Sequence, residues 1–440
     1  LRALPPVVVS GLQLLLSSPS HAQTIIRDAE TEYIIRELAT PLFAAAGLDP
    51  NFVQTYLVRD ERINAFVARG QRVFLNTGLL LAAETPMQVM GVLAHETGHL
   101  AGGHLARTQE ALRNAKAQVV AALLLGAAAN VGAGGNAAAA VVFAGGRQIA
   151  ERSLLRYSRA QESAADFAGV RLMESAGYSA RSMAVFMEIL AEQEGLLESR
   201  RDPYLQSHPL FPERIAALRS AAETQSSVNV PVPDGWTDAF ARVQAKLYGY
   251  LESPSRVLRR YPLTDESVPA RYARAVSYDQ AGRLNEALAE IATLLAAAPD
   301  DPYFLELHGQ VLLQHGRVAD AIAPYQRAVD QAPNEPQIRA GLAAAQIATG
   351  DTTLLSAAIT NLQAALTVDR HYAEGWRQLA VAHGRNGDIG QSALASAEQY
   401  MLSGPGSEAL RFAQQALRML SVGSPGWLRA QDIENAVKPQ

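Results

Sequence analysis

The chain has 440 residues, a formal net charge of −5 and no cysteine, and 48% of its residues are hydrophobic. This length predicts two or three domains with room for a substantial core. The weak negative charge gives no electrostatic case for nucleic-acid binding. Without cysteine, a thiol nucleophile, a disulfide framework, a cysteine-held zinc and a lipidated N-terminal cysteine are all excluded. Any metal ion must therefore be held by histidines and carboxylates.

Residues 1–22 have the pattern of a secretory signal peptide. Arg2 precedes a short apolar run from Val7 to Leu16, and small side chains at Ser20 and Ala22 are typical of a cleavage site after Ala22. An apolar tail or membrane anchor is the alternative, but the run is short for a membrane span. We therefore expect export and removal of this segment. An exported chain of this size without cysteine fits the bacterial periplasm.

A helix over residues 24–46 and three short strands are predicted next, from helical and alternating apolar spacing. The strands cover residues 54–58, 63–68 and 72–75, with turn-forming residues between them. We expect them to form a small β-meander. The edge of such a sheet can accept an extended peptide through main-chain hydrogen bonds.

The segment His95-Glu96-Thr97-Gly98-His99 lies among apolar residues that predict a buried helix. Two histidines four residues apart lie on one face of a helix, so both imidazoles can bind the same metal ion. Glu96 then leans over the open side of that metal, where a water would sit. A zinc hydrolase uses this arrangement, because the metal acidifies the water and the carboxylate removes its proton. The alternative is a polar helix face without a metal.

A third metal ligand must come from outside this motif. On a continued helix His104 would point away from His99, so we expect it to be a polar residue at the helix end. Glu162 is better suited, because it lies on a second predicted helix whose small residues 163–165 allow close helix approach. Asp166, one turn further on, can accept the free N–H of a ligand histidine and fix its tautomer. Without the upstream motif, two solvated helix acids would be the preferred interpretation.

Residues 117–146 contain no charged side chain, and a glycine-rich centre divides them into two apolar arms. Each arm is shorter than a transmembrane helix requires. A buried helical hairpin is one interpretation. The other is a flap over the cleft or a peripheral contact with a membrane surface.

His208 lies in a loop flanked by proline, in the segment Ser207-His208-Pro209 that precedes Arg214. It can approach the metal as a fourth ligand, or it can donate a hydrogen bond to the oxyanion of the reaction with help from Arg214. A third hypothesis is that His208 blocks the open metal position in a resting form. An ordinary surface-loop histidine is the remaining alternative.

The second half of the chain carries an internal repeat. Gly282, Gly316 and Gly350 are evenly spaced, and Pro299 and Pro333 follow the same interval. This is the period of tetratricopeptide repeats, in which stacked helix pairs form a solenoid with a concave binding face. A further unit near residues 376–387 is displaced by a short insertion at 352–354, and residues 408–437 are expected to be a degenerate unit or cap.

Taken together, the histidine motif, Glu162 with Asp166 and the segment from Ser207 to Ile215 resemble M48-type gluzincin metallopeptidases. The resemblance covers approximately residues 24–218. It implies an α+β zincin-like domain that is mostly helical, and one Zn²⁺ per chain. It also implies His95, His99 and Glu162 as zinc ligands, Glu96 as general base, and Asn64, Ala65 and Phe66 as the strand that lines the substrate cleft.

The expected organisation is a signal peptide at 1–22, a metallopeptidase domain at 23–223, a linker with bridging helices at 224–262 and an all-α repeat domain at 263–440. The resemblance implies a periplasmic endopeptidase in outer-membrane protein quality control or assembly. Its repeats would recruit unfolded or stalled outer-membrane proteins or the barrel assembly machinery. The alternative is a chaperone-like binding or adaptor protein whose zinc site is gated or little used.

Overall fold

The computed structural model describes residues 25–108, 158–196, 208, 212–224 and 231–438, together with 110, 111, 113, 114 and 117. The expected signal peptide and the apolar stretch after residue 117 lie outside the described residues. Within the described parts, no helix is both long and apolar enough to cross a membrane. The chain divides into two compact units. Residues 1–26 and Ile35–Pro233 belong to the first, whereas Arg27–Ile34 and Asp234–Gln440 belong to the second.

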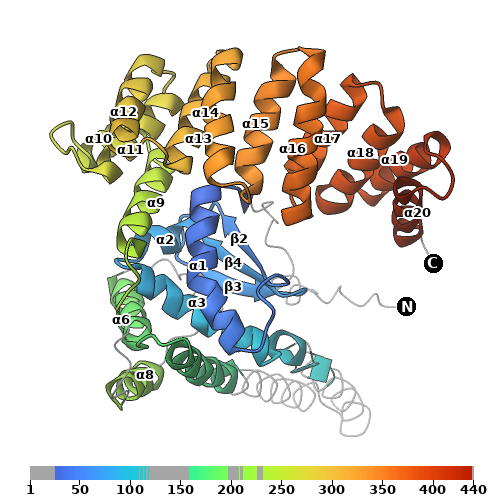
Figure 1. Cartoon of the computed structure of the whole chain (residues 1–440). Coiled ribbons are helices and arrows are strands. Elements are labelled where there is room, and N and C mark those ends of the chain that lie inside the picture. The colour runs from blue at the N-terminus through green and yellow to red at the C-terminus, as the bar shows by residue number, and fades with distance from the viewer. Residues whose placement is uncertain are drawn as a thin grey trace, which may run out of the picture. The chain divides into compact units, whose positions relative to one another are not determined.

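The first unit combines a small sheet with helices (Figure 1). Its strands are β1 Ile25–Ile26, β2 Gln54–Val58, β3 Ala65–Ala68 and β4 Arg72–Asn76. Its helices are α2 Thr77–Ala82, α3 Pro86–Ala101, α6 Arg181–Leu196 and α8 Pro212–Thr224, with further helical residues at 104–108 and 158–175. Helix α1 Ala29–Ala45 contributes buried Leu38 and Leu42 to this unit, while its first residues belong to the second.

The sheet has the strand order β1-β2-β4-β3, so it is not the meander that the sequence predicts. Strand β4 pairs in parallel with β2 and antiparallel with β3. The parallel pair requires the chain to cross over between β2 and β4. Strand β3 lies on the side of β4 that faces away from β2. As a result β3 is an edge strand of the described sheet, and it contacts helix α3.

Helix α3 begins after a residue with clear capping chemistry. The hydroxyl of Thr85 accepts a hydrogen bond from the backbone N–H of Gln88, and Pro86 occupies the first turn, where its missing N–H costs nothing. All residues from Gln88 to His99 are buried. A Cβ added at Gly98 would lie 2.8 Å from the carbonyl oxygen of Ala165. Glycine at position 98 therefore allows α3 and the helix over 158–175 to pack closely.

The second unit is a series of helices, stacked side by side from α11 to α20 (Figure 1). It contains α9 Trp236–Leu251, α10 Pro254–Arg260, α11 Val268–Gln280, α12 Leu284–Ala297, α13 Pro302–Gln314, α14 Val318–Gln331, α15 Pro336–Ala348, η2 Thr352–Leu354, α16 Leu355–Val368, α17 Ala373–Arg385, α18 Ile389–Ser403, α19 Gly406–Met419 and α20 Pro425–Val437. The insertion expected at 352–354 is the 3₁₀ helix η2. The evenly spaced Gly282, Gly316 and Gly350 have φ of +72°, +77° and +75°, which explains glycine at the turn inside each helix pair.

The segment Arg27–Ile34 places acidic side chains among cations of the second unit. Lys246, only 3% exposed, pairs with the carboxylate of Asp28 and lies 3.7 Å from that of Glu30. Arg242 lies 2.8 Å from Glu30, and the Tyr272 hydroxyl donates to Glu30 at 2.7 Å. Burial by itself raises the pKa of Asp28, but the charge and hydrogen bond of Lys246 offset this, and the pKa is lowered. Lys246 therefore offsets the burial of Asp28, whereas burial still raises the pKa of Glu30 despite Arg242 and Lys246.

We expect Lys246→Met to destabilise the second unit, because it leaves Asp28 and Glu30 buried with one cation fewer. Removing one partner of a buried ion pair costs about 3 kcal/mol. For a unit of this size, the midpoint of thermal unfolding should fall by roughly 6–12 °C. Differential scanning calorimetry of the full chain measures this. The matched control is Lys438→Met, which breaks an exposed pair with Glu434 and should change the midpoint little. Equal shifts in the two variants would contradict the prediction.

Candidate metal centre

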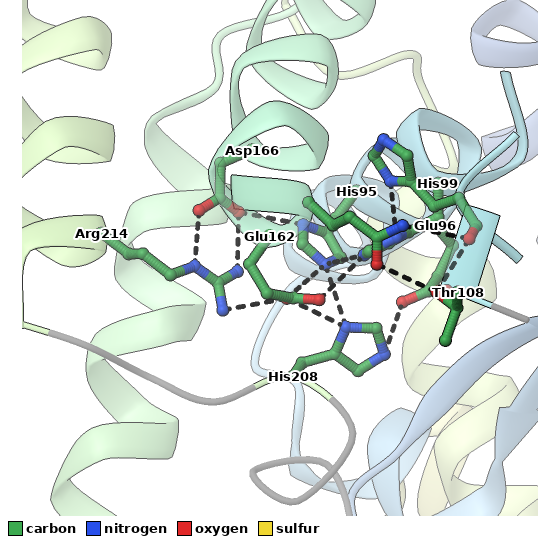
Figure 2. A network of polar contacts seen from close by, with 10 residues as sticks. His95, Glu96, His99, Thr108, Glu162, Asp166, His208 and Arg214 are labelled. Atoms are coloured by element: carbon green, nitrogen blue, oxygen red, sulfur yellow. Dashed lines mark hydrogen bonds and ion pairs between the residues drawn. The ribbon is translucent and has the colours of Figure 1, made fainter. Parts of the chain in front are cut away.

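The predicted site residues come together from three separate segments of the first unit (Figure 2). Helix α3 supplies His95, Glu96 and His99, and the helix over 158–175 supplies Glu162 and Asp166. Arg214 lies in the first turn of α8, and His208 lies shortly before this helix. All seven residues are at most 7% exposed.

Four of these residues present donor atoms to one point. His95, His99, Glu162 and His208 each offer one ligand atom, and all four atoms lie within 4.8 Å of one another. His95 Nε2 lies 3.0 Å from His99 Nε2 and 3.2 Å from His208 Nδ1. Glu162 oxygens lie 3.1 Å from His208 Nδ1 and 3.4 Å from both His95 Nε2 and His99 Nε2. Nitrogen and carboxylate donors this close together, and buried, fit a metal ion.

The spacing of the donors can be compared with that of a four-coordinate zinc site. Four ligands at zinc–nitrogen distances of about 2.0–2.1 Å form a tetrahedron with edges of roughly 3.3–3.4 Å. Five separations, measured to both oxygens of Glu162, are 3.0–3.4 Å and so are close to that edge length, and one ligand atom from each of the four residues lies within 4.8 Å of the others. Three imidazoles and one carboxylate are also a donor set that suits zinc far better than calcium or magnesium, which prefer oxygen.

Asp166 lies behind the metal-binding face of His95. His95 Nδ1 is 2.9 Å from Asp166 Oδ1, so the N–H at Nδ1 donates to the carboxylate and Nε2 keeps its lone pair for a metal. Burial lowers the pKa of His95, but hydrogen bonds and charges of Asp166 and Glu162 more than offset this and raise it to about 10. The carboxylates thus make His95 a more basic ligand.

Arg214 contacts two carboxylates of the helix over 158–175, those of Asp166 and Glu162. Its Nε and Nη2 donate to Asp166 at 2.6 and 2.8 Å, and its Nη1 lies 3.0 Å from Glu162 Oε2. Burial alone would raise the pKa of Glu162, but hydrogen bonds from His208, His95 and His99 lower it well below its usual range. In this arrangement Arg214 is engaged with Asp166 and Glu162.

Glu96 differs from its neighbours in its hydrogen bonding. The side chain is fully buried, and neither carboxylate oxygen accepts a hydrogen bond from any described residue. Oε1 lies 3.5 Å from His208 Nε2, on the side where the four metal donors meet. A buried carboxylate costs free energy unless something polar satisfies it. Its position beside the donors suits a group that receives a proton from a bound molecule.

Two further sequence predictions concern the strand of the substrate cleft and His104. Asn64 and Phe66 flank Ala65 at the start of edge strand β3, which contacts α3, and the side-chain oxygen of Asn64 is buried without a hydrogen bond from the described residues. His104 does not point away from the site, as the sequence predicts on a continued helix. Its Nδ1 lies 3.0 Å from His99 Nδ1, and burial lowers its pKa to about 4.

Comparison with known proteins gives the same division of the chain. Residues 26–222 match Peptidase family M48, and residues 272–336 match a tetratricopeptide repeat. The chain is 28% identical over 410 residues to the Beta-barrel assembly-enhancing protease of Escherichia coli O157:H7, with 91% of this chain and 81% of that protein covered. The protein of the same name in Yersinia pestis is 27% identical over 405 residues, covering 90% and 80%.

Another relative matches less than half of the chain. The mitochondrial metalloendopeptidase OMA1 of Schizosaccharomyces pombe is 28% identical over 188 residues, which cover 43% of this chain and 52% of that protein. The matches to these metalloproteases agree with the buried donor cluster of α3, Glu162 and His208. Residues 26–222 therefore form a metalloprotease domain of Peptidase family M48, and tetratricopeptide repeats follow it in the same chain.

Proposed function

We propose that this chain is a zinc-dependent endopeptidase in which His95, His99 and Glu162 hold the zinc and Glu96 is the general base. One observation carries the proposal: a buried set of four donors lies beside a buried carboxylate that accepts no hydrogen bond from the described residues. When bound, zinc supplies Lewis-acid chemistry, because it lowers the pKa of a water and polarises a carbonyl oxygen.

Glu96 moves the proton in this reaction. Its carboxylate removes a proton from water while the water oxygen forms a bond to the carbonyl carbon of the scissile peptide. The C–N bond then breaks, and Glu96 passes the proton to the departing nitrogen. The two products are a carboxylate and an amine, so the atoms of one water are divided between them. Because Glu96 is fully buried, the carboxylate reaches the substrate without competing bulk water.

Asp166 and Arg214 keep the ligands in place during this cycle. Asp166 accepts the Nδ1–H of His95, which fixes the tautomer that binds metal through Nε2. Arg214 forms a two-point contact with Asp166 and a third contact with Glu162, so the helix over 158–175 is held against α8. We assign Arg214 to this positioning role.

The substrate is proposed to bind along the edge strand β3. An extended peptide can add to the outer edge of β3, the last strand of the described sheet, through main-chain hydrogen bonds. The contact between β3 and α3 supports this choice, because it brings the strand that begins with Ala65 and Phe66, directly after Asn64, beside the helix that carries Glu96. The specificity of such binding depends mainly on the backbone of the substrate, which suits an endopeptidase that acts on unfolded chains.

The cellular setting is proposed from the relatives. Proteins named Beta-barrel assembly-enhancing protease match 90% or more of this chain, which supports a role in outer-membrane protein assembly or quality control. The signal-like pattern of residues 1–22 supports a periplasmic location. Tetratricopeptide repeats support binding of protein partners, which we take to be unfolded or stalled outer-membrane proteins or the barrel assembly machinery.

A second candidate function is a binding or adaptor protein whose metal site is closed at rest. The presence of a fourth protein donor favours this second function. His208 is a fourth donor beside His95, His99 and Glu162, whereas a catalytic zinc site keeps one position open. The two functions differ in one outcome: an endopeptidase hydrolyses peptides once His208 leaves the metal site, and an adaptor protein does not.

Metal removal tests the proposed function. We expect the purified chain to contain one zinc and to hydrolyse casein. Treatment with 1,10-phenanthroline should remove nearly all activity, because water then lacks the Lewis acid that activates it. Stoichiometric Zn²⁺ should restore the activity, whereas Mg²⁺ should not. Metal content by mass spectrometry and release of labelled peptides are the measurements. A chain without zinc would refute the site assignment, and a zinc-loaded but inactive chain would favour the second candidate.

A further inference from the structure

His104 lies against a metal-binding histidine through an unusual turn of the chain. Helix α3 ends at Ala101, and Gly103 adopts φ of +62°, a left-handed conformation that glycine reaches without strain. On a continued helix, His104 would be rotated from His99 by about 140°. The glycine turn instead returns the chain, so that His104 is 6% exposed and its Nδ1 lies 3.0 Å from His99 Nδ1.

The two nitrogens in this contact must share one hydrogen. If His104 donated it, His99 Nδ1 would be the acceptor, and a neutral His99 would carry its own hydrogen on Nε2. That nitrogen is the one among the metal donors, 3.0 Å from His95 Nε2 and 3.4 Å from Glu162. A metal can bind His99 Nε2 only when the hydrogen of His99 is on Nδ1. His104 must then be the acceptor.

We propose that His104 is a positioning residue for the metal site, whose Nδ1 accepts the Nδ1–H of His99 and thereby fixes the tautomer and ring orientation of that ligand. This inference rests on the proposed role of His99 as a metal ligand. It makes the two histidines of α3 equivalent in one respect: each has a partner at Nδ1. The partner of His95 is the carboxylate of Asp166, and the partner of His99 is a neutral imidazole.

The surroundings of His104 hold its ring in this place. Its backbone carbonyl accepts hydrogen bonds from Thr108 Oγ1 at 2.8 Å and from Gln161 Nε2 at 3.0 Å. Gln161 precedes the proposed ligand Glu162, so these bonds join the turn to the second ligand helix. A Cβ added at Gly102 would lie 2.6 Å from His104 Nε2, and glycine there leaves room for the imidazole. The backbone bonds do not involve the imidazole and remain when only the side chain is replaced.

Zinc affinity of the full chain tests the proposal, by competition with a chromophoric chelator. His104→Phe keeps a ring of similar size but has no acceptor, and we expect it to weaken zinc binding by about 10–100-fold. His104→Asn can accept through Oδ1 and should recover most of the affinity. The visible spectrum of the Co²⁺-substituted chain should change in His104→Phe and resemble the parent in His104→Asn. The control His371→Phe replaces an exposed histidine of the second unit and should bind zinc like the parent.

Two outcomes would overturn the inference. Zinc affinity of His104→Phe within about twofold of the parent would show that the hydrogen bond does not matter. Equal losses in His104→Phe and His104→Asn, with thermal unfolding of both apo chains at the parent temperature, would assign the effect to packing. Failure of this inference can be distinguished from failure of the proposed function. In the second case the parent chain itself would bind no zinc.

Discussion

The Glu96→Gln variant is expected to bind zinc like the parent and to lose peptide hydrolysis by about 10²–10⁴-fold, the usual contribution of a general base. Glutamine has nearly the shape of glutamate but cannot accept the proton of water. Glu96 is not one of the four clustered donors, so the metal site should be unaffected. The measurements are kcat/KM on a fluorogenic peptide or casein, and zinc content of the same preparation.

A matched substitution elsewhere in the first unit controls for the loss of a carboxylate. Glu188 on α6 pairs with Arg219 at the surface, and Glu188→Gln should retain the parent kcat/KM. If Glu96→Gln kept activity within tenfold of the parent, another group would have to be the base. If it lost zinc instead, Glu96 would belong to the binding set rather than to proton transfer.

The parts of the site that the sequence predicts best are those encoded by short spacing on one helix. His95, Glu96 and His99 are brought together by helical geometry alone, and an apolar context is enough to predict that the helix is buried. Glu162 and Asp166 follow in the same way, as neighbours one turn apart on a second helix. Small residues are the signal that the two helices approach closely, and Gly98 against Ala165 shows how that contact is made.

Features that depend on a tight turn, or on contacts between distant segments, could not be predicted from local spacing. The parallel pairing of β2 with β4 is a choice between strand orders that alternating apolar residues do not distinguish. The contact of His104 with His99 depends on the left-handed Gly103, and the pair Gly102-Gly103 was the available signal that α3 ends there. The packing of Asp28 against Lys246 joins residues more than two hundred positions apart, and no local pattern encodes it.

His208 is the residue whose role the sequence leaves open, and the structure gives reason to expect that it restrains activity. Its Nδ1 lies 3.2 Å from His95 Nε2 and 3.1 Å from Glu162, at the corner that a substrate or water needs. Its Nε2 is 3.5 Å from Glu96, the proposed base. One side chain therefore competes both for the open metal position and for the space beside the carboxylate.

We expect His208→Ala to raise kcat/KM, by about tenfold if the closed arrangement holds nine-tenths of the molecules, because activity scales with the open fraction. Zinc affinity should fall in the same variant, since one of four donors is gone. A rise in activity with a fall in affinity is the signature of a gate, and the control His371→Ala should change neither. If His208 instead stabilised the oxyanion, activity would fall by about 10²–10³-fold, as when one such donor is removed. That loss would exclude the gate, because freeing the fourth corner could then not be what limits hydrolysis.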